Sequence, residues 1–127
     1  METAEQRVHA FIQDYQQWQQ GAQRLDDLDR IARLRAVKAA YQALLEKHCL
    51  PGTQGQGISF GPEPSHHVEL ERITNSRSDG DSALVTTSLS LPGGQVLHYE
   101  YHLRPHDGSW RIKSLLFVDD DGKCESL

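Results

Sequence analysis

Three side chains with metal-binding chemistry occupy every second position of one predicted strand: His98, Glu100 and His102. Alternate residues of a strand share a face about 6–7 Å apart, so these side chains and one further ligand have the composition of a zinc site. The expected neighbours across the strand pair are Lys113 and Arg111, whose positive charges repel a metal ion. We therefore predict a polar outer face with cross-strand pairs, and neither a metal nor a cofactor.

The remaining histidines and the cysteines give weaker signals. His66 and His67 are adjacent, and adjacent strand residues point to opposite faces. His48 and Cys49 fall at the predicted end of a helix, where a histidine readily caps carbonyl groups. Cys49 has no base and orienting acid at a motif spacing, so no nucleophile is predicted, and with Cys124 it is expected to be a free thiol.

Proton-transfer catalysis needs a carboxylate or histidine base inside an apolar pocket, with a phenol or second acid opposite. The predicted interior is rich in rings and contains almost no acid, and His48 is the one titratable group on a predicted buried helix stripe. We therefore predict that the protein is not an enzyme and has no catalytic residue. The rings are predicted to form the core or to line a pocket for a flat apolar ligand: Tyr15, Trp18, Tyr41, Tyr99, Tyr101 and Trp110.

Composition limits the classes of partner. The chain of 127 residues suits a single domain, 1–127, with its own core. Its formal net charge of −5 disfavours a nucleic-acid surface, because phosphate binding needs clustered Lys and Arg. Its apolar runs are shorter than a membrane span, and its first residues lack the order of a signal peptide. We expect no nucleic-acid or membrane partner and a cytoplasmic location.

The first half of the chain predicts two helices. Thr3 and Gln6 have the spacing of a capping box for a helix that Gly21 is expected to end or kink. A second helix is predicted to begin near Asp26–Asp29 and to stop before Pro51-Gly52. Its buried stripe comprises Leu34, Val37, Tyr41, Leu44, Leu45 and His48, extended by Leu28 and Ile31.

The second half predicts a meander of about four antiparallel strands. Val68–Thr74 reads as a first strand with a bulge, and Ser78–Asp81 is a hairpin turn signal. A second strand follows with Ala83, Val85, Thr87 and Leu89 inward, and a short loop is predicted to place Leu91 opposite Leu97. Helices followed by strands predict an α+β fold in which two helices pack on one face of a curved antiparallel sheet.

The last hairpin is predicted to pair Leu103 with Trp110, Tyr101 with Ile112 and Tyr99 with Ser114. This register puts Leu115 and Phe117 on the outer face of the sheet, where with Leu84 they form a candidate homodimer surface.

This layout resembles the nuclear transport factor 2-like superfamily, also described as a cystatin-like α+β cone. Within it the chain is most similar to the immunity proteins of bacterial polymorphic toxin systems. Three stretches carry the resemblance: FIQDYQQW (11–18), AYQALLEKHCLPG (40–52) and YEYHLRPHDGSWRIKSLLFVDDDGK (99–123). The last contains a Tyr-x-Tyr strand, a DG-x-W turn and a late DGK.

The resemblance implies a non-catalytic antidote that binds and neutralises a cognate toxin domain. An acidic surface suits a basic toxin, and the candidate partner-binding residues are Asp26, Asp27, Asp29, Asp119, Asp120 and Asp121. The plain alternative is that these residues form a helix start and a solvated turn. Because the resembled fold also hosts isomerases and dehydratases, a small-molecule-binding or catalytic cone-fold protein is the alternative function.

Overall fold

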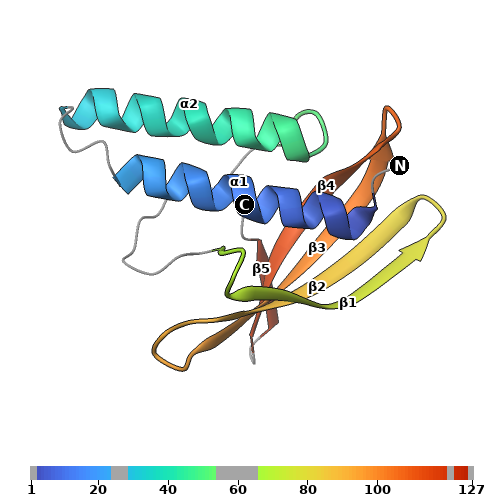
Figure 1. The fold of residues 1–127 in the computed structure, drawn as a ribbon. Coiled ribbons are helices and arrows are strands. Elements are labelled where there is room, and N and C mark those ends of the chain that lie inside the picture. The colour runs from blue at the N-terminus through green and yellow to red at the C-terminus, as the bar shows by residue number, and fades with distance from the viewer. Residues whose placement is uncertain (1–2, 24–28, 54–65, 120–121, 126–127) are drawn as a thin grey trace.

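The computed structural model describes residues 3–23, 29–53, 66–119 and 122–125, in which two helices precede five strands. The helices α1 (Ala4–Gln23) and α2 (Arg30–His48) lie side by side and antiparallel on one face of a curved sheet, with α1 nearer the strands (Figure 1). The sheet is antiparallel with the strands in chain order: β1 (Glu71–Asp79), β2 (Ser82–Ser90), β3 (Val96–His106), β4 (Ser109–Asp119) and β5 (Gly122–Glu125). The predicted α+β fold is confirmed, and β5 adds to the expected four strands.

The capping box at the start of α1 is confirmed. The Thr3 hydroxyl accepts from the Gln6 amide N–H at 3.1 Å, and the Gln6 side-chain oxygen accepts from the Thr3 N–H at 2.9 Å. The prediction that Gly21 ends this helix is wrong, because the helix continues to Gln23. A glycine in an exposed turn costs a helix only about 1 kcal/mol, which neighbouring residues offset.

Helix α2 is fixed at both ends. The Asp29 carboxylate accepts from the Ala32 N–H at 2.8 Å, so Asp29 is the N-cap. At the other end, the Leu50 N–H donates to the Ile112 carbonyl of β4 at 3.0 Å. The Arg111 guanidinium donates to the carbonyls of Glu46 and Lys47, two acceptors in the last turn of the helix. The end of α2 is therefore fastened to β4.

The buried stripe of α2 is shorter than predicted. Val37, Tyr41, Leu44, Leu45 and His48 are buried, but Leu34 and Ile31 are 45% and 64% exposed, so that part of the prediction is wrong. The reason is position, since the amino-terminal end of α2 extends past the sheet (Figure 1). Leu28 lies outside the described residues.

The β1–β3 part of the sheet has the predicted faces with a shifted register. The bulge falls between Ile73 and Asn75, and the turn follows Asp79 as predicted, although β1 begins at Glu71 rather than at Val68. Leu97 pairs with Leu89, not with the predicted Leu91. The connecting loop is longer than expected, and a hydrogen bond of 2.8 Å from the Leu91 N–H to the Gln95 carbonyl closes it. A shift of two residues leaves every side chain on its predicted face.

The predicted β3–β4 register is wrong. A tight turn at Asp107-Gly108, with φ of 52° and 80°, pairs His106 with Ser109. The same register pairs Leu103 with Ile112, and a bulge between His102 and Leu103 then shifts the rest of the ladder by one residue. Tyr101 and Tyr99 face Leu115 and Phe117 in place of Ile112 and Ser114, while Glu100 and His102 face Leu116 and Ser114 in place of Lys113 and Arg111.

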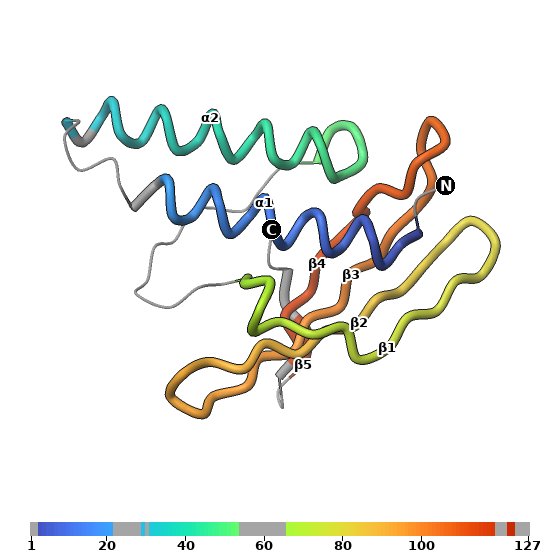
Figure 2. The backbone as a smooth tube through the Cα atoms, viewed as in Figure 1, coloured from blue at the N-terminus to red at the C-terminus, as the bar shows by residue number. Residues whose placement is uncertain are grey.

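The bulge moves Leu115 and Phe117 to the inner face. Leu115 is completely buried and Phe117 packs against the core, so the predicted homodimer surface built on them is wrong. Figure 2 follows the backbone through the β1–β2 and β3–β4 hairpins, whose tips diverge as the sheet twists. Neither helix in the described residues is long and apolar enough to cross a bilayer.

Candidate functional site

A polar cluster lies at the centre of the apolar core. It consists of His66, Glu71 at the start of β1, Thr87 on β2 and Tyr101 on β3. The Glu71 Oε1 atom is 2.8 Å from His66 Nδ1, and its Oε2 atom accepts from the Thr87 hydroxyl at 2.6 Å and from the Tyr101 hydroxyl at 2.7 Å. The prediction that the interior holds almost no acid is therefore wrong.

The hydrogen-bond pattern fixes where the protons sit. A Glu71 carboxylate only accepts, so His66 Nδ1 carries the hydrogen between them. The Tyr101 hydroxyl donates to Glu71 and lies 3.0 Å from the same His66 nitrogen, from which it accepts. One imidazole N–H and two hydroxyls therefore surround a single carboxylate.

Electrostatics keep the carboxyl ionised. Burial alone raises the pKa of Glu71, but the charge and hydrogen bond of His66 and the hydrogen bonds from Thr87 and Tyr101 outweigh it, so the pKa lies below its usual value. Burial and the nearby Glu71 charge raise the pKa of Tyr101 well above its usual value. At neutral pH the phenol stays protonated and remains a donor.

The predicted aromatic set gathers mostly around this cluster. The His66 ring lies 4.6 Å from the Tyr15 ring and 4.8 Å from the Tyr99 ring, measured between centroids. Tyr41 lies 4.9 Å from Trp18, whose indole N–H donates to the Val37 carbonyl of α2 at 3.2 Å. These rings fill the space between the helices and the sheet.

Trp110 is the member of the set that lies elsewhere. It pairs with Pro105 near the β3–β4 turn and packs at the edge of the core.

An acid, an imidazole and a phenol in mutual contact are the components of acid–base catalysis. Here the Glu71 side chain has no exposed surface, and the His66 side chain is 1% exposed. A substrate therefore does not reach the carboxylate in this conformation. The sequence did contain a signal for the cluster, because the inward-facing hydroxyls of Thr87 and Tyr101 need a buried acceptor.

A second histidine pair joins the two helices. His48 Nε2 lies 2.7 Å from the Asp14 carboxylate, which also accepts from Lys47 at 2.8 Å. The Arg7 guanidinium only donates and is 3.0 Å from His48 Nδ1, so Nδ1 accepts and Nε2 carries the hydrogen of a neutral ring. Burial lowers the pKa of His48, the charges of Arg7 and Lys47 add to this, and Asp14 opposes it.

The other predicted sites have structural partners or lie outside the described residues. Burial raises the pKa of the Cys49 thiol to about 12, which leaves it unreactive at neutral pH. The Glu100 carboxylate lies 2.8 Å from Lys123 and 3.3 Å from His102, so it is already paired with a positively charged side chain. Within the described ranges, no three His, Cys, Asp or Glu side chains are placed to share a metal ion.

Of the predicted acidic partner-binding residues, the structure describes the side chain of Asp29 alone. Asp29 caps α2, and its carboxylate is engaged there. Asp26, Asp27, Asp120 and Asp121 lie outside the described residues, as does the side chain of Asp119.

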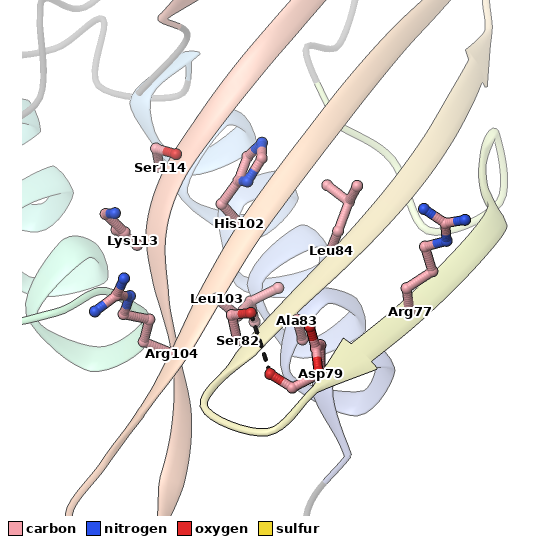
Figure 3. Close-up of a pocket in the computed structure, with 10 residues that line it drawn as sticks. All are labelled: Arg77, Asp79, Ser82, Ala83, Leu84, His102, Leu103, Arg104, Lys113 and Ser114. Atoms are coloured by element: carbon pink, nitrogen blue, oxygen red, sulfur yellow. Dashed lines mark hydrogen bonds between the residues drawn. The ribbon is translucent and has the colours of Figure 1, made fainter.

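Three exposed cations of the sheet border a hollow of about 390 Å³ on its outer face, and Asp79 is also among the lining residues. Figure 3 views this face with the helices behind the sheet: Arg104 and Lys113 lie together on one side of the hollow, and Arg77 lies on the other. His102 and Ser114 add polar groups to the lining, and Leu84 adds an apolar one.

Comparison of the chain with protein-family models, curated proteins and solved structures gives no match.

Proposed function

We propose that this chain is a binding protein without catalytic activity, specifically an immunity protein that neutralises a cognate toxin domain by occupying it. One observation carries the proposal: the acid–base groups of the interior are closed off and satisfied by one another. Both oxygens of Glu71 are taken, and its side chain has no exposed surface. Catalysis needs such groups in contact with substrate, whereas a protein that acts through its surface does not.

The specific form of the proposal depends on the sequence. The stretches 11–18, 40–52 and 99–123 resemble bacterial immunity proteins. They occupy α1, the end of α2 and the β3–β5 region. Such a protein forms a stoichiometric complex in which the toxin's active site or its movement is blocked.

The test pairs the protein with the toxin domain encoded next to its gene. That domain is expressed from an inducible promoter with and without this protein, and colony counts and co-purification are measured. We expect survival and a stable complex. Cell death despite soluble, folded protein, or a neighbouring gene whose product is not toxic, rejects the antidote function.

A second candidate function, a small-molecule-binding or catalytic cone-fold protein, is favoured by the presence of Glu71, His66 and Tyr101 in one cluster. The two functions differ in stoichiometry. A binder inhibits the purified toxin in a titration that ends at equal molar amounts, because each molecule is consumed in a complex. An enzyme acting on the toxin or its product removes toxicity well below equimolar amounts and continues to do so with time.

A further inference from the structure

The hollow on the outer face of the sheet is bordered by unpaired positive charge. Arg77, Arg104 and Lys113 are exposed, and none of them has a carboxylate or hydrogen-bond partner within the described part of the chain. By contrast, Lys47 contacts Asp14 and Lys123 contacts Glu100, each at 2.8 Å. This contrast occurs in a chain with a formal net charge of −5.

The bulge in the β3–β4 ladder helps to create this surface. It falls between His102 and Leu103, and Lys113 is the β4 residue left without a partner in the register. As a result Lys113 and Arg104 lie next to each other on the same side of the hollow (Figure 3). Like charges on neighbouring strands destabilise a sheet, and an incoming anion relieves that repulsion.

The chemistry of the lining selects a carboxylate-bearing ligand. An arginine guanidinium presents a planar fork that matches a carboxylate with two parallel hydrogen bonds. Arg77 and Arg104 supply such forks from opposite sides, and Ser114 supplies a hydroxyl. Leu84 offers an apolar contact between them. A hollow of about 390 Å³ accommodates a few side chains of an extended segment.

Nucleic acid fits this surface less well. Affinity for a phosphate backbone comes from many simultaneous Lys and Arg contacts, and the hollow has three cations with Asp79 among its lining residues. The negative charge of the whole chain also repels a polyanion at long range. A short acidic segment meets the local positive charge without carrying that repulsion along its length.

We propose that the outer hollow bordered by Arg77, Arg104 and Lys113 docks an acidic segment of a partner protein. That this partner is a toxin depends on the function proposed above, but the docking chemistry does not. The surface also refines the sequence-based expectation of a basic partner, because the partner segment that contacts this face carries carboxylates.

The test is an NMR titration of the isotope-labelled protein at low salt, with a short capped peptide of alternating Asp and Glu as the probe. We expect shifts at the amides of Leu84, His102 and Ser114. The double variant Arg104→Glu/Lys113→Glu should bind the peptide at least about tenfold more weakly. The matched control is Arg35→Glu/Lys38→Glu, the same charge change at exposed positions of α2, which should retain most of the affinity. The melting temperatures of both variants are measured to check that each of them folds.

Four outcomes overturn the proposal. The first two are an absence of shifts in the parent protein and an equal loss of affinity in both double variants. The third is a stronger shift of the same amides with a single-stranded DNA oligonucleotide, and the fourth is a concentration-dependent shift of this face without peptide, which would assign the face to a second copy of the chain. The result is independent of the antidote assay. Peptide binding at the hollow in a protein that fails to protect cells rejects the immunity function and leaves the docking surface in place.

Discussion

Replacing Glu71 by Leu should destabilise the protein strongly, because the carboxylate is the common acceptor of the buried cluster. The substitution leaves the Nδ1–H of His66 and the hydroxyls of Thr87 and Tyr101 without that acceptor. Each unsatisfied buried donor costs about 1–3 kcal/mol. The hydroxyls can rotate and leucine adds apolar contact, so we expect a loss near that of a broken buried pair, about 3–5 kcal/mol.

The structure also predicts how Glu71 and Tyr101 depend on each other. Tyr101→Phe alone removes a hydrogen bond to a charged group and should cost about 1.5–3 kcal/mol. In the Glu71→Leu background the phenol has lost its acceptor, so the same change should cost close to nothing. The coupling free energy of the double-mutant cycle should therefore be about 1.5–3 kcal/mol.

Urea unfolding of the four proteins, followed by circular dichroism, measures these free energies, provided that the m-values agree. Glu69→Leu, an exposed acid two positions before Glu71, is the matched control and should change stability by less than about 0.5 kcal/mol. Additive effects of the two core substitutions, or a cost for Glu71→Leu similar to that of the control, would refute the reasoning.

Three further predictions concern other parts of the molecule. The pKa of His48 is lowered in the folded protein, so the unfolded chain binds a proton at this histidine more readily. The free energy of unfolding should therefore be full above the unfolded pKa of about 6.5 and should fall as the pH drops below it. Urea unfolding at several pH values should show this slope in the parent and a weaker one in His48→Gln; equal slopes contradict the prediction. Arg111→Met removes the donor to the carbonyls at the end of α2 and should cost about 1.5–3 kcal/mol in urea unfolding. Arg104→Met, which breaks no hydrogen bond or ion pair within the described residues, should be near neutral. In a Cys124→Ser background, a thiol reagent should label Cys49 only on unfolding, because its pKa is about 12; rapid labelling of the folded protein would disprove this.

The features that could be predicted from the sequence are those set by neighbouring residues. The capping box needs only Thr3 and Gln6, three positions apart, and it forms as expected. The alternation from Ala83 to Leu89 places β2 correctly on its inner face. The end of α2 before Pro51 follows from the chemistry of proline and glycine alone.

The features that escaped prediction depend on distant parts of the chain. Glu71 is an ordinary acid in a polar stretch, and it becomes a core residue because Thr87 and Tyr101, 16 and 30 positions away, supply its donors. The predicted β3–β4 register was wrong first at the turn, which is tighter than expected, and then at the bulge, which exchanges the two faces of β4. The residue types near His102 give no signal for that bulge. Ile31 is exposed because the amino-terminal end of α2 extends beyond the edge of the sheet. Helical periodicity does not indicate where the neighbouring sheet ends.

The contact between the end of α2 and strand β4 has a consequence for synthesis of the protein in the cell. Arg111 caps a helix end that was completed 64 residues earlier. At about 5–20 residues per second, a ribosome takes about 3–13 s to add that length. During this interval both helices have been synthesised, but the strands that cover their apolar faces have not. The yield of native protein should therefore depend on chaperones that shield the nascent helices until the last hairpin emerges.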